Sequence, residues 1–247
     1  MYTNGYIFRY ASIMVIIAAA LLSLAAMLLK PFQERNRAIN KMQGILASAQ
    51  VKECTADNAI QLFNKYIVEE QVIDPKGNIL DSYTKSPKED AQAFKIDLKK
   101  EYYNKAQNKP YKLPLYIAKK DGQTIYIIPM RGTGLWGPIW GNIALTSDFK
   151  TVIGVFFDHK GETPGLGAEI AKPKFQAEFK GKTIFDNQGH FTSIEVVKGG
   201  IAKLPKEQQI HGVDAISGGT ITSKGVDAML RNVIESYLPY IKNTAKH

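Results

Sequence analysis

The longest uninterrupted apolar stretch of the chain lies near its N-terminus. Tyr10 to Leu29, YASIMVIIAAALLSLAAMLL, carries no charge and is bounded by Arg9 and Lys30. At about 1.5 Å per residue, a helix of this length crosses the ~30 Å hydrocarbon core of a bilayer. A cleaved signal peptide would have a shorter apolar region and a small-x-small cleavage site directly after it. The stretch MLLKP that ends the run lacks such a site, so the pattern favours a retained transmembrane anchor over residues 1–31.

The charges that flank this run leave its orientation open. Arg9 precedes it, whereas Lys30, Arg35, Arg37 and Lys41 follow it. Taken literally, the positive-inside rule would place the large C-terminal part in the cytoplasm. The rule weakens when a long domain follows the helix, because long domains translocate largely regardless of charge.

The pattern changes to helical spacing and polar segments over residues 32–110. Apolar residues within Phe32 to Val51 recur at helical spacing, which predicts a helix leading away from the anchor. Thr55 to Asp57 resembles an N-cap for a further helix over residues 58–73, and Asp74 to Asn78 reads as a turn. The lysine-rich segment from Asp81 to Pro110 predicts a solvated, partly helical insertion. We therefore expect a helical linker and a polar insertion in this region.

Residues 111–247 alternate between apolar segments that predict strands and polar segments that predict turns. Three hairpins are predicted, from segments 115–118 with 124–129, 140–145 with 151–157, and 182–185 with 190–197. The last apolar positions, from Val226 to Ile241, repeat at three and four and predict an amphipathic helix. Hairpins flanked by helices favour an α+β fold: an N-terminal transmembrane helix, then one domain of antiparallel sheet with flanking helices.

Composition narrows the chemistry that the chain can perform alone. The formal net charge is +9, yet the lysines are scattered and no nucleic-acid motif stands out, so we expect no nucleic-acid partner. One cysteine, Cys54, excludes an intramolecular disulfide and a cysteine-built metal cluster. The four histidines show no metal-ligand spacing, so we expect no metal site. Any redox chemistry must come from a bound cofactor.

Three glycine-rich segments are the candidates for a binding site. Asp214 to Ser223, DAISGGTITS, precedes the last helix, with Thr222 or Ser223 placed to cap it. Glycines before a helix N-terminus suit a phosphate, because free backbone N–H groups and the positive end of the dipole meet there. The alternative is a tight turn followed by an N-cap. Gly161 to Ile170, GETPGLGAEI, and Gly132 to Gly141, GTGLWGPIWG, can likewise be turns or the walls of a pocket.

Together these segments resemble a known family. An N-terminal anchor, an E-T-P-G-L-G loop at Glu162 to Gly167 and a D-x-x-S-G-x-T motif at Asp214 to Thr220 are shared with the membrane-anchored FMN-binding subunits of sodium-pumping NADH:quinone oxidoreductases and of the related Rnf complexes. In that family the final threonine of S-G-A-T is esterified to the phosphate of FMN, and the matching residue is Thr220. Gly219 stands where alanine is usual, which should not remove the hydroxyl chemistry.

The resemblance implies a set of cofactor contacts around covalent FMN. Thr220 would be the attachment point, and the remaining positions would shape the phosphate pocket or lie along the flavin. These further positions are Asp214, Ser217, Gly218, Gly219, Thr222, Glu162, Thr163, Gly165, Leu166, Gly167, Leu135 and Trp136. No catalytic acid or base is expected, because transfer of single electrons requires none.

The resemblance also implies how the protein works and with whom. It implies an electron-carrying subunit of a sodium-transporting NADH:quinone reductase in the bacterial inner membrane, with a periplasmic domain and a flavin transferase that attaches FMN. NADH is expected to react on a partner subunit, because the chain lacks a G-x-G-x-x-G fingerprint between a strand and a helix. The GTGLW and GETPGLGAE segments favour the sodium-pump branch, whereas His159-Lys160 is similar to the Rnf pattern. A membrane-anchored binding module without flavin is the alternative from another class.

Overall fold

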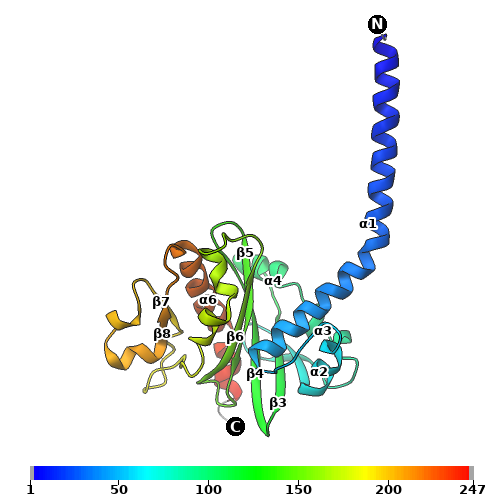
Figure 1. Ribbon diagram of the computed structural model, residues 1–247. Helices are drawn as coiled ribbons and strands as arrows, with labels where there is room; N and C mark the ends of the chain where they lie inside the picture. Colours follow the sequence, from blue (N-terminus) through cyan, green and yellow to red (C-terminus); the bar gives the residue numbers. More distant parts are fainter. Residues whose placement is uncertain (1–2, 245–247) are drawn as a thin grey trace. The chain divides into compact units, whose positions relative to one another are not determined.

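The N-terminal part of the chain is a single helix. The structure, a computed structural model, describes residues 3–244 and divides into two parts, residues 1–41 and residues 42–247. Helix α1, Asn4–Ser48, makes up the first part from Asn4 onward and continues into the second (Figure 1). Within the described residues, α1 is the one helix long and apolar enough to cross a membrane. The helix continues through Pro31, so the apolar run and the polar helix expected after it form one element.

The second part is built on a six-stranded antiparallel sheet with the strand order β2-β1-β3-β4-β5-β6. The strands are β1 Ile67–Ile73, β2 Ile79–Tyr83, β3 Leu113–Lys120, β4 Gln123–Thr133, β5 Pro138–Leu145 and β6 Val152–His159. This sheet and its flanking helices confirm the α+β fold with antiparallel pairing.

The first two predicted hairpins are confirmed. Strands β3 and β4 are joined by Asp121 and Gly122, whose φ angles of 51° and 76° turn the chain sharply between Lys120 and Gln123. A pair of left-handed residues of this kind matches the right-handed twist of the strands on either side. Strands β5 and β6 form the second hairpin.

Two predictions about secondary structure are wrong. The helix expected over residues 58–73 ends early, because α2 spans only Ala59–Tyr66 and β1 follows at once. The β-branched residues in IVEEQVI fit a half-buried strand, and pairing with β3 decides the outcome. The third hairpin shrinks to an isolated bridge between Phe185 and Phe191. Its second segment instead supplies β7, Glu195–Val197, which pairs in parallel with β8, Gly212–Asp214.

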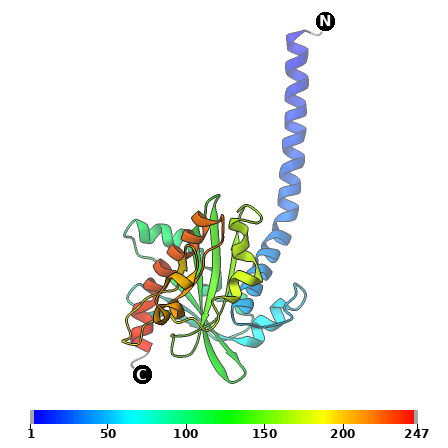
Figure 2. The same cartoon turned by 60° about the vertical axis from the view of Figure 1, so that its left-hand side comes forward.

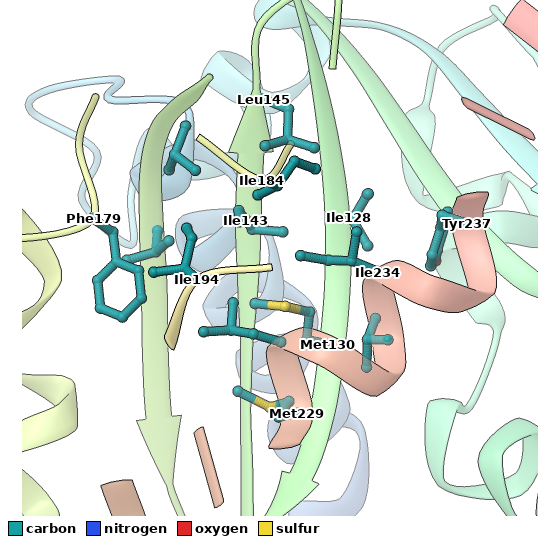
Figure 3. Close-up of a cluster of buried hydrophobic side chains, with 14 of the residues drawn as sticks. Ile128, Met130, Ile143, Leu145, Phe179, Ile184, Ile194, Met229, Ile234 and Tyr237 are labelled. Carbon is teal, nitrogen blue, oxygen red and sulfur yellow. The ribbon is translucent and has the colours of Figure 1, made fainter. Parts of the chain in front are cut away.

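Helix α6, Thr220–Thr244, covers one face of the sheet and completes the main hydrophobic core. Its predicted apolar stripe is confirmed, since side chains from Val226 to Ile241 pack into that core. Figure 3 shows Met229, Ile234 and Tyr237 of this helix against residues of β4 and β5. Burying one such side chain contributes about 1.5–3 kcal/mol to folding. The stripe therefore anchors the helix to the sheet.

The opposite face of the sheet is covered by residues 42–48 of α1 and by short helices. Asn142 and Phe156 point to this face, and a Cβ atom on Gly44 of α1 would lie 2.8 Å from the Phe156 ring. Phe63 of α2 packs edge-on against Tyr116 of β3. In Figure 2 the strands lie between α6 in red and the cyan segment that includes α2. The remaining helices are η1 Lys88–Asp90, α3 Gln92–Lys95, α4 Leu98–Ala106, η2 Gly167–Ala171, α5 Pro173–Ala177, η3 Ile201–Lys203 and η4 Lys206–His211.

Candidate functional site

The three glycine-rich segments meet beside the first turn of α6. One links β4 to β5, the second follows β6, and the third precedes α6. We call their meeting point the three-loop junction and define it as residues 133–137, 161–167 and 216–222. The contacts that bring these segments together centre on one buried carboxylate.

That carboxylate belongs to Glu162, whose side chain is only 4% exposed. Its Oε1 accepts a hydrogen bond from the backbone N of Trp136 at 2.9 Å. Its Oε2 accepts one from Oγ1 of Thr222 at 2.5 Å. The Glu162 side chain, which belongs to the second loop, thus binds the first loop through one oxygen and α6 through the other. Hydrogen bonds to a charged acceptor contribute about 1.5–3 kcal/mol each, so this contact can hold the loops together.

The indole of Trp136 is hydrogen-bonded at its edge, and most of the residue is exposed. Its Nε1 donates to Oγ1 of Thr163 at 3.1 Å, yet the residue is 68% exposed. Leu135 and Leu166, from the first and second loops, are 48% and 41% exposed. Ile221, at the start of α6, is 56% exposed. Four large apolar side chains of one junction are thus exposed and available to an apolar ligand.

Ile221 was not among the residues selected from the sequence. Its position directly after the candidate attachment residue is the signal that could have identified it, since an apolar side chain there gains no burial in the helix stripe. Leu135, Trp136 and Leu166, which were selected from the sequence, lie exposed in the first and second loops.

The second loop has the turn that its sequence predicted. The N–H of Leu166 donates to the carbonyl of Thr163 at 3.1 Å, and Gly165 has φ +74°. A left-handed glycine at the third position of a turn that begins with Thr163 and Pro164 is typical of a type II turn. The turn carries the chain from Glu162 on one side of the loop to Leu166 on the other.

Glycines allow the loops to approach one another closely. A Cβ atom on Gly134 would lie 2.5 Å from Oε1 of Glu162, and one on Gly167 would lie 2.5 Å from Oε2. A Cβ on Gly167 would also collide with Oγ1 of Thr222. Any larger residue at these two positions would displace the carboxylate or its donors.

The third loop leads into α6 earlier than expected. The helix begins at Thr220, and the N–H of Ser223 closes its first turn by donating to the carbonyl of Gly219 at 2.9 Å. The prediction that Thr222 or Ser223 caps the helix is therefore wrong. The Thr222 hydroxyl donates to Glu162 instead, and Oγ of Ser223 accepts from the backbone N of Ile216 at 3.1 Å.

The same geometry separates the two threonines. Thr222 is 1% exposed and its hydroxyl proton is donated to Glu162, whereas Thr220 is half-buried. The backbone N–H groups at Thr220, Ile221 and Thr222 precede the first hydrogen bond within the helix. These groups and the dipole of a long helix make the surroundings of Thr220 favourable for an anion.

The rest of the third loop lies at the surface. Ser217 and Gly218 are exposed, and Gly218 adopts φ +74° with its Cα facing Leu166. Gly219 is buried between Ile216 and the backbone of Leu166. Asp214 lies farther from the junction, at the end of β8, where its Oδ1 accepts from the backbone N of Ile201 at 2.7 Å.

Elsewhere the second part of the chain contains a polar cavity of about 460 Å³. Its lining includes Asp186, Glu195, Glu207 and Arg231, and it shares no residue with the three-loop junction. Among residues 3–244, histidine, cysteine and acidic side chains form no group of three that could hold a metal ion. This cavity thus lies apart from the junction, where the segments selected from the sequence converge.

Comparison with known proteins identifies the class. The model of the FMN-binding domain family matches residues 134–235, a range that contains the second and third loops and residues 134–137 of the first. A relative from Pseudomonas aeruginosa, the NqrC component of a Na(+)-translocating NADH-quinone reductase, is 32% identical over 230 residues, covering 89% of this chain and 87% of the relative. The corresponding component from Haemophilus ducreyi is 33% identical over 245 residues, covering 93% and 91%.

Solved structures agree with this result. The NqrC component of the Na(+)-translocating NADH-quinone reductase from Parabacteroides distasonis is 41% identical, with a TM-score of 0.73 over 86% of this chain and 96% of that one. The Shewanella oneidensis NqrC structure is 26% identical, with a TM-score of 0.68 over 86% and 99%. The fold and these matches thus define an FMN-binding domain that follows one helix long and apolar enough to cross a membrane. The chain belongs to the NqrC family of the Na(+)-translocating NADH-quinone reductase, which decides for the sodium-pump branch over the Rnf branch.

Proposed function

We propose that this chain carries FMN esterified through its phosphate to Oγ1 of Thr220, and that it passes electrons within a sodium-translocating NADH:quinone reductase. The observation that carries the proposal is the contrast between Thr220 and Thr222 in the first turn of α6. The hydroxyl of Thr222 is buried and donated to Glu162, while Thr220 lies partly open at the helix N-terminus.

The surroundings of Thr220 suit a phosphate diester. Unpaired N–H groups at a helix N-terminus and the positive end of the dipole stabilise negative charge there. Ser217 is exposed beside them and offers a hydroxyl, while Gly218 and Gly219 add no side chain that would cover the site. The phosphate would be held by this turn without a lysine or arginine inside the junction.

The surroundings of the flavin ring would be the exposed apolar surface. Leu135, Trp136 and Leu166 supply large apolar area in two adjacent loops, and Ile221 extends it next to Thr220. Trp136 is kept in place by its bonds to Glu162 and Thr163, so its indole would meet the ring with little loss of conformational entropy. Gly165 and Gly167 leave room for the ribityl chain along the second loop.

The protein's own contribution is position and burial. When bound, FMN can take up electrons singly or in pairs and so can link two-electron and one-electron partners. The residues of the junction orient the cofactor, exclude water from one side of it and hold its phosphate. No acid or base is assigned, because no proton has to move for single-electron transfer through this site.

Attachment requires an activated donor, because an alcohol and a free phosphate do not condense in water. We propose that a flavin transferase uses a flavin phosphoanhydride. Oγ1 of Thr220 would form the new bond to the phosphorus that carries the flavin, the anhydride P–O bond would break, and the other phosphate of the anhydride would leave with the bridging oxygen. The hydroxyl proton of Thr220 goes to a base of the transferase or to solvent.

We further propose that the anchor lies in the bacterial inner membrane and that the domain is periplasmic, where the transferase acts. Helix α1 supports the anchor by its length and apolar composition. Protease added to intact spheroplasts should digest the domain and leave only the membrane-spanning part of α1 behind. Protection of the domain would place it in the cytoplasm, as the flanking charges indicate. An N-terminal sequence that begins beyond residue 30 would show that the anchor is removed.

The flavin itself can be tested on the purified full-length protein. We expect a yellow protein whose flavin spectrum stays with the chain after denaturation and gel filtration, and an intact mass raised by one FMN ester. A colourless protein, or flavin that separates on denaturation, would contradict the covalent proposal. The colourless result would favour an anchored binding module without flavin.

A further inference from the structure

The buried bond between Glu162 and Thr222 has a geometric effect on the neighbouring residue Thr220. Successive residues of an α-helix are rotated by about 100°, so positions two apart are rotated by about 200° and point to nearly opposite sides of the helix. Thr222 points inward to the carboxylate and is 1% exposed. Thr220, two residues earlier in the same turn, is therefore directed to the open side of the helix.

We infer that Glu162 and Thr222 are positioning residues, which turn the Thr220 hydroxyl toward the incoming flavin donor and hold Trp136 beside it. The inference rests on the proposed attachment at Thr220. It assigns Glu162 and Thr222 to a role exerted through Thr220 and Trp136, instead of the direct cofactor contact that the family resemblance implied for them.

The chemistry of the carboxylate fits this role. An ionised carboxylate only accepts hydrogen bonds, and both of its oxygens here face donors from other segments. The backbone N of Glu162 donates to Nδ1 of His159 at 3.1 Å, which fixes the residue at a third point. A residue held at these three points keeps the loops and the first turn of α6 in fixed positions relative to one another.

Direct contact with the cofactor phosphate fits poorly. Glu162 is 4% exposed, and a carboxylate beside a phosphate would repel it. Gly134 and Gly167 lie so close to the carboxylate that a Cβ atom on either would lie 2.5 Å from one of its oxygens. The carboxylate is thus enclosed by protein atoms, whereas Thr220 remains accessible.

The test measures how fast flavin is attached. Full-length protein, prepared without flavin and kept in detergent, is mixed with the flavin transferase and its flavin phosphoanhydride donor, and the adduct on Thr220 is followed by peptide mass spectrometry. Thr222→Val keeps the side-chain shape but removes the donor, and Glu162→Ala removes both acceptors. We expect each to slow attachment by about 10- to 100-fold, the loss expected when a reacting group is misplaced.

Conservative and combined variants separate positioning from loss of structure. Thr222→Ser retains the hydroxyl and should react within about twofold of wild type. The double variant should be no slower than Glu162→Ala alone, because both changes break the same contact. Asp227→Ala is the matched control. Asp227 lies on α6, and its carboxylate also accepts a hydrogen bond from a backbone N–H, that of Val196. The substitution should leave the attachment rate unchanged.

The outcomes discriminate between the claims. A Thr222→Val protein that folds and acquires flavin at the wild-type rate would overturn the inference, whatever its melting temperature. An equal loss in Asp227→Ala would also overturn it, because any destabilisation of α6 would then suffice. If Glu162→Ala does not fold, the Val and Ser variants of Thr222 still decide. Wild-type protein without an adduct on Thr220 would instead defeat the proposed function itself.

Discussion

The first turn of α6 and the body of the same helix are built in different ways. In the body, Val233, Ile234 and Tyr237 are buried in the main core against the sheet. In the first turn, Ile221 is 56% exposed, and Thr222 is buried through a hydrogen bond to Glu162. Apolar burial fixes the body of the helix, while hydrogen bonds and close glycine contacts fix the first turn and the loops of the three-loop junction.

This difference predicts that stability and flavin attachment can be altered separately. A loss of apolar burial in the body should weaken folding but leave the geometry of the first turn unchanged. A change in the first turn, or in the loops bound to it, should affect attachment at a smaller cost in stability.

The largest effect on stability is expected from Ile234→Ala. The side chain is fully buried, and removing it leaves a cavity, so the free energy of unfolding should fall by about 2–5 kcal/mol. Urea denaturation of the detergent-solubilised protein measures this change. Ile221→Ala on the same helix should stay within about 0.5 kcal/mol of wild type. Equal losses at the two positions would show that the two ends of α6 do not differ.

A smaller loss of stability with a large loss of attachment is expected from Gly167→Ala. The new methyl group would collide with Oγ1 of Thr222 and with Glu162, which should cost about 1–3 kcal/mol and shift both. Gly161→Ala in the same loop is the control, because its Cβ would meet nothing within 4 Å. Thermal melting and intact mass are measured on both. Normal flavin content in Gly167→Ala would show that the junction tolerates displacement.

The sequence predicted the body of α6 and the central hairpins well, because their apolar spacing and the Asp121-Gly122 turn are local signals. It failed where pairing partners are distant. Residues 67–73 continue a helical pattern, yet they form β1 because β3 lies beside them. Glu195–Val197 pairs with β8 across a long excursion of the chain that no local pattern indicates.

The candidate site was predicted in part. The glycine motifs identified all three loops and the threonine pair, since turns that need glycine leave a clear local signal. The contact between Glu162 and Thr222 joins residues 60 positions apart, and no spacing rule reveals it. Capping depends only on neighbouring residues, so the sequence favoured that role for Thr222. Ile221 was not selected from the sequence.

The smallest effect on stability is expected from Trp136→Ala. The indole is 68% exposed, so the free energy of unfolding should change by no more than about 0.5 kcal/mol. Its backbone N–H remains available to Glu162, so flavin should still be attached. The fluorescence and the redox potential of the flavin should change, because the ring loses a neighbouring surface. If both stay at their wild-type values, Trp136 does not contact the ring.

The central claim is that the open residue of the first turn carries the flavin, and the site of the adduct tests it most directly. Wild-type protein and the variants Thr220→Val and Thr222→Val are purified from cells that contain the transferase, digested and mapped by peptide mass spectrometry. We predict one FMN ester on Thr220 in wild type, none in Thr220→Val, and an adduct still on Thr220 wherever Thr222→Val is labelled. An ester on Thr222, or one that persists in Thr220→Val, would contradict the account.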